Sequence, residues 1–117
     1  MRSIATCLCC GLLLITASCG FNDIRDRSAT LEKLLATNAP LSAVESAIGK
    51  IPIYRRGSPE WNTRRAACAR LPNSWYQQLV QKIDNASAFG AISTPSMQTW
   101  VFLDDKDRII DFEVGTQ

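Results

Sequence analysis

Five cysteines are the residues of this 117-residue chain best suited to chemistry, and the chain contains no histidine. A cysteine nucleophile needs an adjacent base or a resolving thiol, and histidine is the usual base. Without histidine, Ser-His and Cys-His catalysis are excluded and the commonest zinc ligand is missing. The role of each cysteine must therefore be inferred from the residues around it in the sequence. The five are Cys7, Cys9, Cys10, Cys19 and Cys68.

The first three cysteines lie in an apolar segment with the profile of a signal peptide. Arg2 is followed by no charged residue until Asp23, and the run from Ile4 to Ile15 is almost entirely apolar. A membrane-spanning helix needs about 20 predominantly apolar residues, whereas this run is shorter and passes into small residues. Residues 1–18 are therefore expected to be a cleaved signal peptide.

The residues around the expected cleavage point form a motif, Ile15-Thr16-Ala17-Ser18-Cys19. This motif resembles the lipobox of bacterial lipoproteins, although Thr16 departs from the aliphatic residue usual there. The resemblance implies that the Cys19 thiol is acylated and that Cys19 becomes the new N-terminus. By resemblance to enterobacterial lipoproteins, Gly20 in place of Asp implies attachment to the outer membrane, facing the periplasm.

Cys68 would then be the one free thiol of the mature chain, so no intramolecular disulfide can form. It lies in the run Ala66-Ala67-Cys68-Ala69, where a buried small residue is expected. The 99 residues of 19–117 are enough to build a hydrophobic core without covalent staples.

A cluster of arginines interleaved with aromatic residues is the most prominent polar feature of the mature chain. Guanidinium groups bind carboxylates and phosphates bidentately, and aromatic rings accept cations or sugars. One interpretation is a binding patch for anionic lipid headgroups, an acidic glycan or an acidic envelope protein, whereas nucleic acid is not expected in this compartment. The patch comprises Tyr54, Arg55, Arg56, Trp61, Arg64, Arg65 and Arg70.

The alternative interpretation is that these arginines pair with the chain itself. Residues 19–70 carry nine Lys or Arg against five Asp or Glu, and residues 71–117 carry three against six. Halves of net charge +4 and −3 could attract each other in the folded domain. Asp104, Asp105 and Asp107 lack the spacing of a Ca²⁺ loop and are expected to form a turn. No metal, cofactor or enzymatic activity is expected.

The N-terminal half predicts two short helices and an edge strand. Residues 19–27 are polar and are expected to be a lipidated tether, with a helix capped by Ser28 or Thr30 ending before Asn38. A capping box of Ser42 and Glu45 predicts a second helix that ends at Gly49. The segment Ile51–Tyr54 is extended, and its proline confines it to a sheet edge.

The C-terminal half predicts two more helices and a hairpin. Asn62 or Thr63 is expected to cap a third helix through Arg70, and Asn73 starts a fourth. One face of the fourth helix is apolar and is expected to be core. That face is formed by Trp75, Tyr76, Leu79, Val80 and Ile83.

The composition of the segment Asp84–Ser96 predicts a loop. Strands over Met97–Leu103 and Ile110–Val114 then form a hairpin whose second strand turns Ile110, Phe112 and Val114 toward the core.

These elements predict a single α+β domain over residues 28–117. We expect a small two-layer domain in which the N-terminal helices and an inserted helical segment pack on an antiparallel sheet that ends in a C-terminal hairpin. The stretch Ser42, Val44, Ile48 and Gly49, with the Trp-Val-Phe-Leu-Asp hairpin, resembles the small lipoproteins of the outer-membrane β-barrel assembly machine. That resemblance implies two helices on a three-stranded sheet, and the helical insertion at about residues 55–90 departs from it.

Two functions follow as hypotheses. The first is a lipid-anchored accessory or structural binding protein of the bacterial cell envelope, serving outer-membrane assembly or integrity. The alternative is a periplasmic inhibitor or immunity protein that acts against a hydrolase or toxin.

Overall fold

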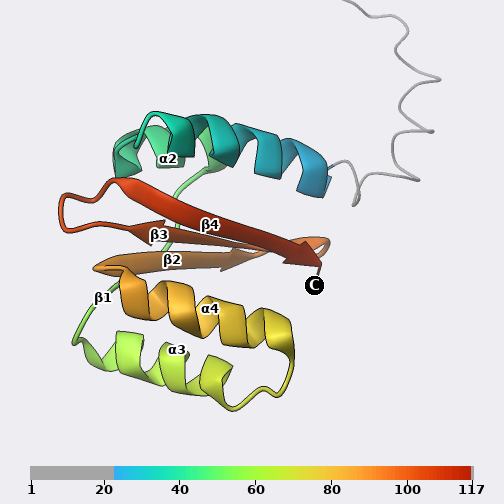
Figure 1. The fold of residues 1–117 in the computed structure, drawn as a ribbon. Helices are drawn as coiled ribbons and strands as arrows, with labels where there is room; N and C mark the ends of the chain where they lie inside the picture. The colour runs from blue at the N-terminus through green and yellow to red at the C-terminus, as the bar shows by residue number, and fades with distance from the viewer. Residues whose placement is uncertain (1–22, 117) are drawn as a thin grey trace, which may run out of the picture.

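The computed structural model describes residues 23–116, which form an antiparallel sheet between two helical layers (Figure 1). The sheet has the strand order β1-β2-β3-β4. Its strands are β1 Ile53–Arg55, β2 Ala88–Ser93, β3 Met97–Leu103 and β4 Ile109–Thr116. The chain is helical over 23–36, and the further helices are α2 Leu41–Ile48, α3 Pro59–Ala69 and α4 Ser74–Asn85.

The α+β class, the antiparallel sheet and the C-terminal hairpin are confirmed. The helix of residues 23–36 and α2 cover one face of the sheet, and α3 and α4 cover the other (Figure 1). The inserted helices, which join β1 to β2, thus add a third layer to the two that were expected. The expected signal peptide, residues 1–18, and Cys19 lie outside the described residues.

The N-terminal helix starts earlier than predicted. Residues 23–27 are already helical, so neither Ser28 nor Thr30 caps the helix, and the predicted tether 19–27 is wrong over its last part. The physical reason is a tertiary contact, because Arg27 Nη1 donates to Thr99 Oγ1 at 2.9 Å and holds this turn on the sheet. The folded domain therefore begins no later than residue 23.

The end of this helix agrees with the prediction. Asn38 takes a positive φ of 51°, and the N–H groups of Asn38 and Ala39 donate to the carbonyls of Leu35 and Leu34. This arrangement is a Schellman motif, in which asparagine replaces the usual glycine. The Asn38 side chain also donates to the carbonyl of Ile109 at 2.7 Å, so the cap joins the helix to β4.

The starts of α2 and α3 show where cap prediction from sequence was wrong. Pro40 precedes α2 and Ser42 lies inside the helix, so the predicted capping box does not form. Ser58 caps α3 by accepting from the Trp61 N–H at 3.2 Å, with Pro59 as the first helical residue. By contrast, Asn73 caps α4 as predicted, accepting from the N–H of Trp75 at 2.9 Å.

The predicted loop over residues 84–96 is wrong, because Ala88–Ser93 forms β2, one of the two inner strands of the sheet. Its small residues reflect close packing. A Cβ atom on Gly90 would lie 2.6 Å from Ile51 Cδ1 and 2.9 Å from Ile53 Cδ1. Small residues in a strand can mark such a close approach rather than a loop.

The C-terminal hairpin forms, but the facing of Ile110 was predicted wrongly. An irregularity in the β3–β4 register pairs Leu103 with Ile109 and Phe102 with Asp111, which leaves Ile110 as the extra residue of a bulge. Ile109 is fully buried and Ile110 is 38% exposed. Beyond the bulge, Phe112 and Val114 pack on the core as predicted.

Alternating residues of the sheet build two separate cores. Toward the N-terminal helices the buried core contains Leu31, Val44, Ala88, Val101, Leu103 and Ile109. Toward α3 and α4 it contains Trp61, Cys68, Leu79, Ile83, Phe89, Trp100 and Phe102. The ring of Phe89 lies at the centre of the second core, with centroid distances of 5.1 to 6.4 Å to four other aromatic rings.

We expect Phe89→Ala to lower the free energy of unfolding by about 3–5 kcal/mol, because it leaves a cavity between α3, α4 and the sheet. Urea denaturation followed by circular dichroism measures this loss. Ile110→Ala is the matched control and should change stability by less than about 0.5 kcal/mol, since that side chain is exposed. Equal losses in the two variants would contradict the described core.

Candidate functional site

The residues of the predicted arginine patch fall into three groups in the structure. Some are buried in the core, some form ion pairs with carboxylates of the chain, and some form no ion pair in the described residues. Trp61 is only 3% exposed and belongs to the core, so little of its ring is accessible to a partner. Its ring contacts Phe89 at 5.1 Å and lies under the Arg56 guanidinium at 4.9 Å. Tyr54 is half-buried and also packs against Phe89.

Two of the patch arginines form bidentate ion pairs with the acidic half of the chain. The Nη1 and Nη2 atoms of Arg55 lie 2.8 and 2.9 Å from the carboxylate oxygens of Asp107. Arg65 binds Asp84 in the same way at 2.5 and 2.8 Å. These hydrogen bonds raise the pKa of both guanidinium groups and lower the pKa of both carboxyl groups. The internal pairing that was the alternative prediction therefore accounts for these two arginines.

The other three arginines differ in their partners. Arg56 donates to the backbone carbonyls of Asp84 and Ala86, where it closes the end of α4. Arg64 lies over the ring of Tyr54, with its Cζ 4.8 Å from the ring centroid. Arg70 is exposed at the end of α3. Within residues 23–116, neither Arg64 nor Arg70 forms an ion pair.

Lys82 joins α4 to β4 and was not predicted from the sequence. Its ammonium group donates to Glu113 Oε2 at 2.6 Å, to Asp111 Oδ1 at 3.2 Å and to the carbonyl of Phe112 at 3.3 Å. Burial disfavours its charge, but the hydrogen bonds that the ammonium donates to Glu113 and Asp111 and the charges of these carboxylates outweigh that effect and raise the Lys82 pKa. Asp111 and Glu113 thus face α4 instead of open solvent.

Cys68 is buried at 5% exposure, as predicted for its alanine-rich helix. Burial raises the pKa of its thiol, and the nearby Arg64 charge opposes this only in part. A thiol with a raised pKa is a poor nucleophile at neutral pH. Cys68 is therefore a core residue.

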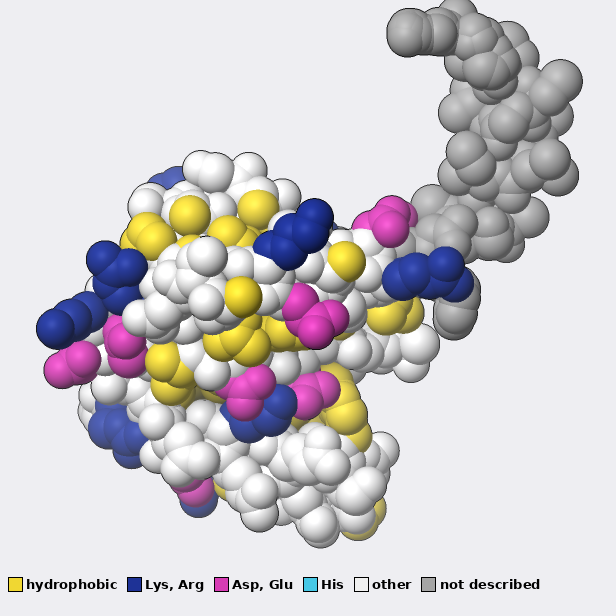
Figure 2. All heavy atoms as spheres, turned by 45° about the horizontal axis from the view of Figure 1, so that its top comes forward, with side chains coloured by type: hydrophobic (Ala, Val, Ile, Leu, Met, Phe, Trp, Pro, Cys, Tyr) yellow, Lys and Arg dark blue, Asp and Glu magenta, His cyan; other side chains and the backbone are white. Residues whose placement is uncertain are grey.

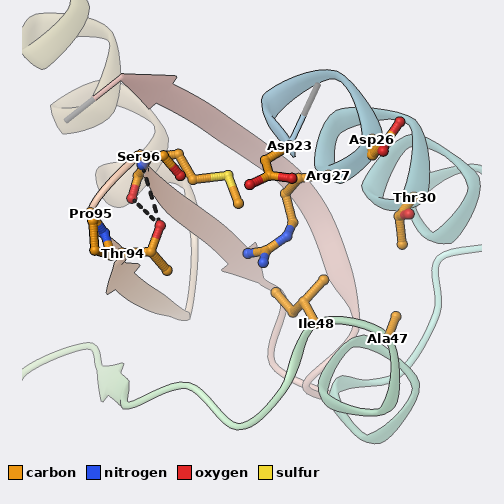
Figure 3. A pocket seen from close by; sticks show the side chains of 10 residues that line it. Asp23, Asp26, Arg27, Thr30, Ala47, Ile48, Thr94, Pro95 and Ser96 are labelled. Carbon is orange, nitrogen blue, oxygen red and sulfur yellow. Dashed lines mark hydrogen bonds between the residues drawn. The ribbon is translucent and has the colours of Figure 1, made fainter. Parts of the chain in front are cut away.

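A cavity of about 570 Å³ lies between the N-terminal helix, the end of α2 and the turn from β2 to β3 (Figure 3). The Arg27 side chain extends into it above Ile48 and opposite the turn, while Asp26 points away. The turn is closed by a hydrogen bond from the Thr94 N–H to the Met97 carbonyl at 2.8 Å. This cavity borders the first described residues of the chain.

Two further cavities lie on the other side of the sheet, beside the loop from α3 to α4. One, of about 370 Å³, is lined by Cys68, Leu71, Tyr76, Gln98 and Trp100 among others. The next, of about 440 Å³, shares Tyr76 and Gln98 and reaches the end of β4. Gln98 lies in the wall that the two cavities share, and its Oε1 accepts a hydrogen bond from Trp100 Nε1 at 3.0 Å.

These three cavities lie at the same end of the molecule. Residue 23, the β2–β3 turn, the α3–α4 loop and the last residues of β4 are all at the right of Figure 1. On the face shown in Figure 2, basic and acidic side chains alternate and do not form a patch of one sign. On that face, the charged side chains therefore form no basic patch.

In the part of the chain that the structure describes, no three His, Cys, Asp or Glu side chains are grouped to hold a metal ion. No helix within residues 23–116 combines the length and apolar character needed to cross a membrane. Comparisons with protein families, curated proteins and solved structures find no match for this chain. The two resemblances noted in the sequence therefore stay predictions.

We expect Lys82→Met to lower the free energy of unfolding by about 1–3 kcal/mol, because it leaves two adjacent carboxylates without their cation. A raised pKa means that this contribution is complete below about pH 10 and is lost as the pH rises through the folded-state pKa. Urea denaturation at neutral and alkaline pH measures it. Arg70→Met, which removes an exposed cation, is the control and should leave stability unchanged; an equal loss there would argue against the Lys82 bridge.

Asp107→Asn should cost less than about 1 kcal/mol at neutral pH, since its pair with Arg55 is largely exposed. Asparagine tolerates the positive φ of 58° at this position, so the turn should survive. The Asp107 pKa is lowered in the folded state, so the contribution is present above about pH 4 and is lost as the pH falls through that pKa. Thermal unfolding of wild type and variant should therefore converge in acid. A difference in stability that persists at low pH would contradict the described ion pair.

Proposed function

We propose that this chain is a lipid-anchored accessory protein of the bacterial cell envelope that acts by binding rather than by catalysis. The observation that carries the proposal is Cys19, which follows the small residues Ala17 and Ser18 and an apolar run with a single basic residue before it. This order matches the anatomy of a signal segment whose cleavage would leave Cys19 first. Attachment to the periplasmic side of the outer membrane is part of the proposal.

The start of the folded domain supports an arrangement close to the membrane. Three residues, Gly20, Phe21 and Asn22, separate Cys19 from Asp23, which is already helical. Four Cα steps span at most about 14 Å, whatever conformation they take. An acylated Cys19 would therefore keep the domain near the headgroups, without a long linker to reach distant partners.

The surfaces at this end of the molecule favour binding. Three cavities of about 370 to 570 Å³ lie at this end, a size that accepts a side chain or a small molecule. The one thiol in the described residues is buried in the core and has a raised pKa. The proposed activity is therefore recognition of an envelope component at the membrane surface.

Intact-mass spectrometry and membrane fractionation of the full chain test the anchor. We expect wild type to have the mass of residues 19–117 plus acyl groups and to sediment with membranes, whereas Cys19→Ser loses both properties. Cys10→Ser is the matched control, because this cysteine lies in the segment to be removed, and it should be lipidated like wild type. An uncut wild-type chain, or a cut chain without lipid, would refute the proposed function.

A further inference from the structure

We infer that the loop between α3 and α4 is a second membrane contact that places Leu71 at the boundary between the headgroups and the acyl chains. The inference rests on the proposed lipid anchor and deepens it, since it states which surface the anchored domain turns to the bilayer. The contact is made by residues 70–76, here named the α3–α4 tip.

The first argument is position. The tip lies at the same end of the domain as residue 23, on the other side of the sheet from the N-terminal helix (Figure 1). The β2–β3 turn connects the two regions, because its residues 94–96 line the cavity beside Arg27 and the flanking residues Ser93 and Gln98 line the cavity beside Leu71. A linkage of about 14 Å at residue 23 brings this whole end toward the membrane.

The second argument is apolar exposure. Leu71 and Ile110 are the two large hydrophobic side chains that stand out as exposed in the described residues, at 41% and 38%. Ile110 lies beyond the β3–β4 turn, at the end of the sheet opposite the tip (Figure 1). Leu71 is instead followed by the half-buried Trp75 and Tyr76, residue types that favour the membrane interface. The end near residue 23 therefore combines an exposed aliphatic side chain with two interfacial aromatic residues close to it in the chain.

The third argument is charge. Residues 61–83 contain no Asp or Glu and carry four basic residues. Arg65 pairs with Asp84, and Lys82 pairs with Asp111 and Glu113, which leaves Arg64 and Arg70 as the basic residues of this stretch without a carboxylate partner in the described residues. Over residues 23–27 two acidic and two basic residues balance. The tip is therefore the cationic part of this end, and it suits a bilayer that contains anionic lipid.

The fluorescence of an environment-sensitive dye attached at position 71 tests the inference. Leu71→Cys and, as the matched control, Ile110→Cys are labelled in the natively lipidated protein after it is reconstituted into vesicles of phosphatidylethanolamine and phosphatidylglycerol. The buried Cys68 should stay unlabelled in the folded parent protein, which is checked first. Circular dichroism and thermal unfolding confirm that both labelled variants are folded.

We expect the dye at 71 to shift its emission to the blue and to lose intensity when the vesicles contain nitroxide-labelled lipids, with no such change at 110. Vesicles of phosphatidylcholine alone should reduce the shift at 71, because Arg70 then has no anionic headgroup to contact. A second dye position, Ser74→Cys, should respond in the same direction as 71.

The possible failures are distinguishable. A chain whose mass shows no lipid refutes the proposed anchor and, with it, the placement of the tip. A lipidated chain in which the dye at 71 stays as exposed to water as the dye at 110 refutes the tip contact alone. A dye at 71 that is shielded in whole envelopes but not in lipid vesicles would assign the tip to a protein partner and overturn the membrane contact.

Discussion

The fold depends on a four-stranded sheet that must be covered on both faces. In β2 and β3, neighbouring residues point to different layers: Ala88 and Val101 to the N-terminal helices, Phe89 and Phe102 to α3 and α4. Neither helical layer has a core of its own without these strands. The α3–α4 pair, although inserted between β1 and β2, is therefore an integral part of the domain. Its removal would expose Phe89, Trp100 and Phe102 to water, which large aromatic side chains strongly disfavour.

Strong local patterns made part of this fold predictable. The apolar face of α4, its Asn73 cap and the β-branched and aromatic residues of β3 are each consistent with the final structure. Strand β2 was mistaken for a loop in part because of Gly90, where the side chains of Ile51 and Ile53, far away in sequence, leave no room for a Cβ atom. Likewise, the helical turn over residues 23–27 depends on the contact of Arg27 with Thr99, far away in sequence. Contacts between residues that are far apart in the chain cannot be predicted from the local sequence pattern.

The same limit applies to the candidate site. The clustering of arginines was visible in the sequence, and so was the opposite charge of the two halves, but the partners of each arginine were not. Asp107 lies 52 residues from Arg55, and Asp84 lies 19 residues from Arg65. Once these pairs form, the patch arginines without a carboxylate partner in the described residues are Arg56, Arg64 and Arg70, and Arg70 is next to the exposed Leu71. In the folded domain, the candidate contact surface is therefore the α3–α4 tip and not the patch as a whole.

The orientation of the domain follows from one short connection. Because at most about 14 Å of chain separates Cys19 from the helix at residue 23, a lipidated protein has little freedom to turn its anchored end away from the bilayer. Neutron reflectometry of the natively lipidated protein on a supported bilayer tests this claim most directly. The account predicts protein density that begins within the headgroup layer, with no water layer between membrane and domain. A water-filled gap beneath the domain would contradict it.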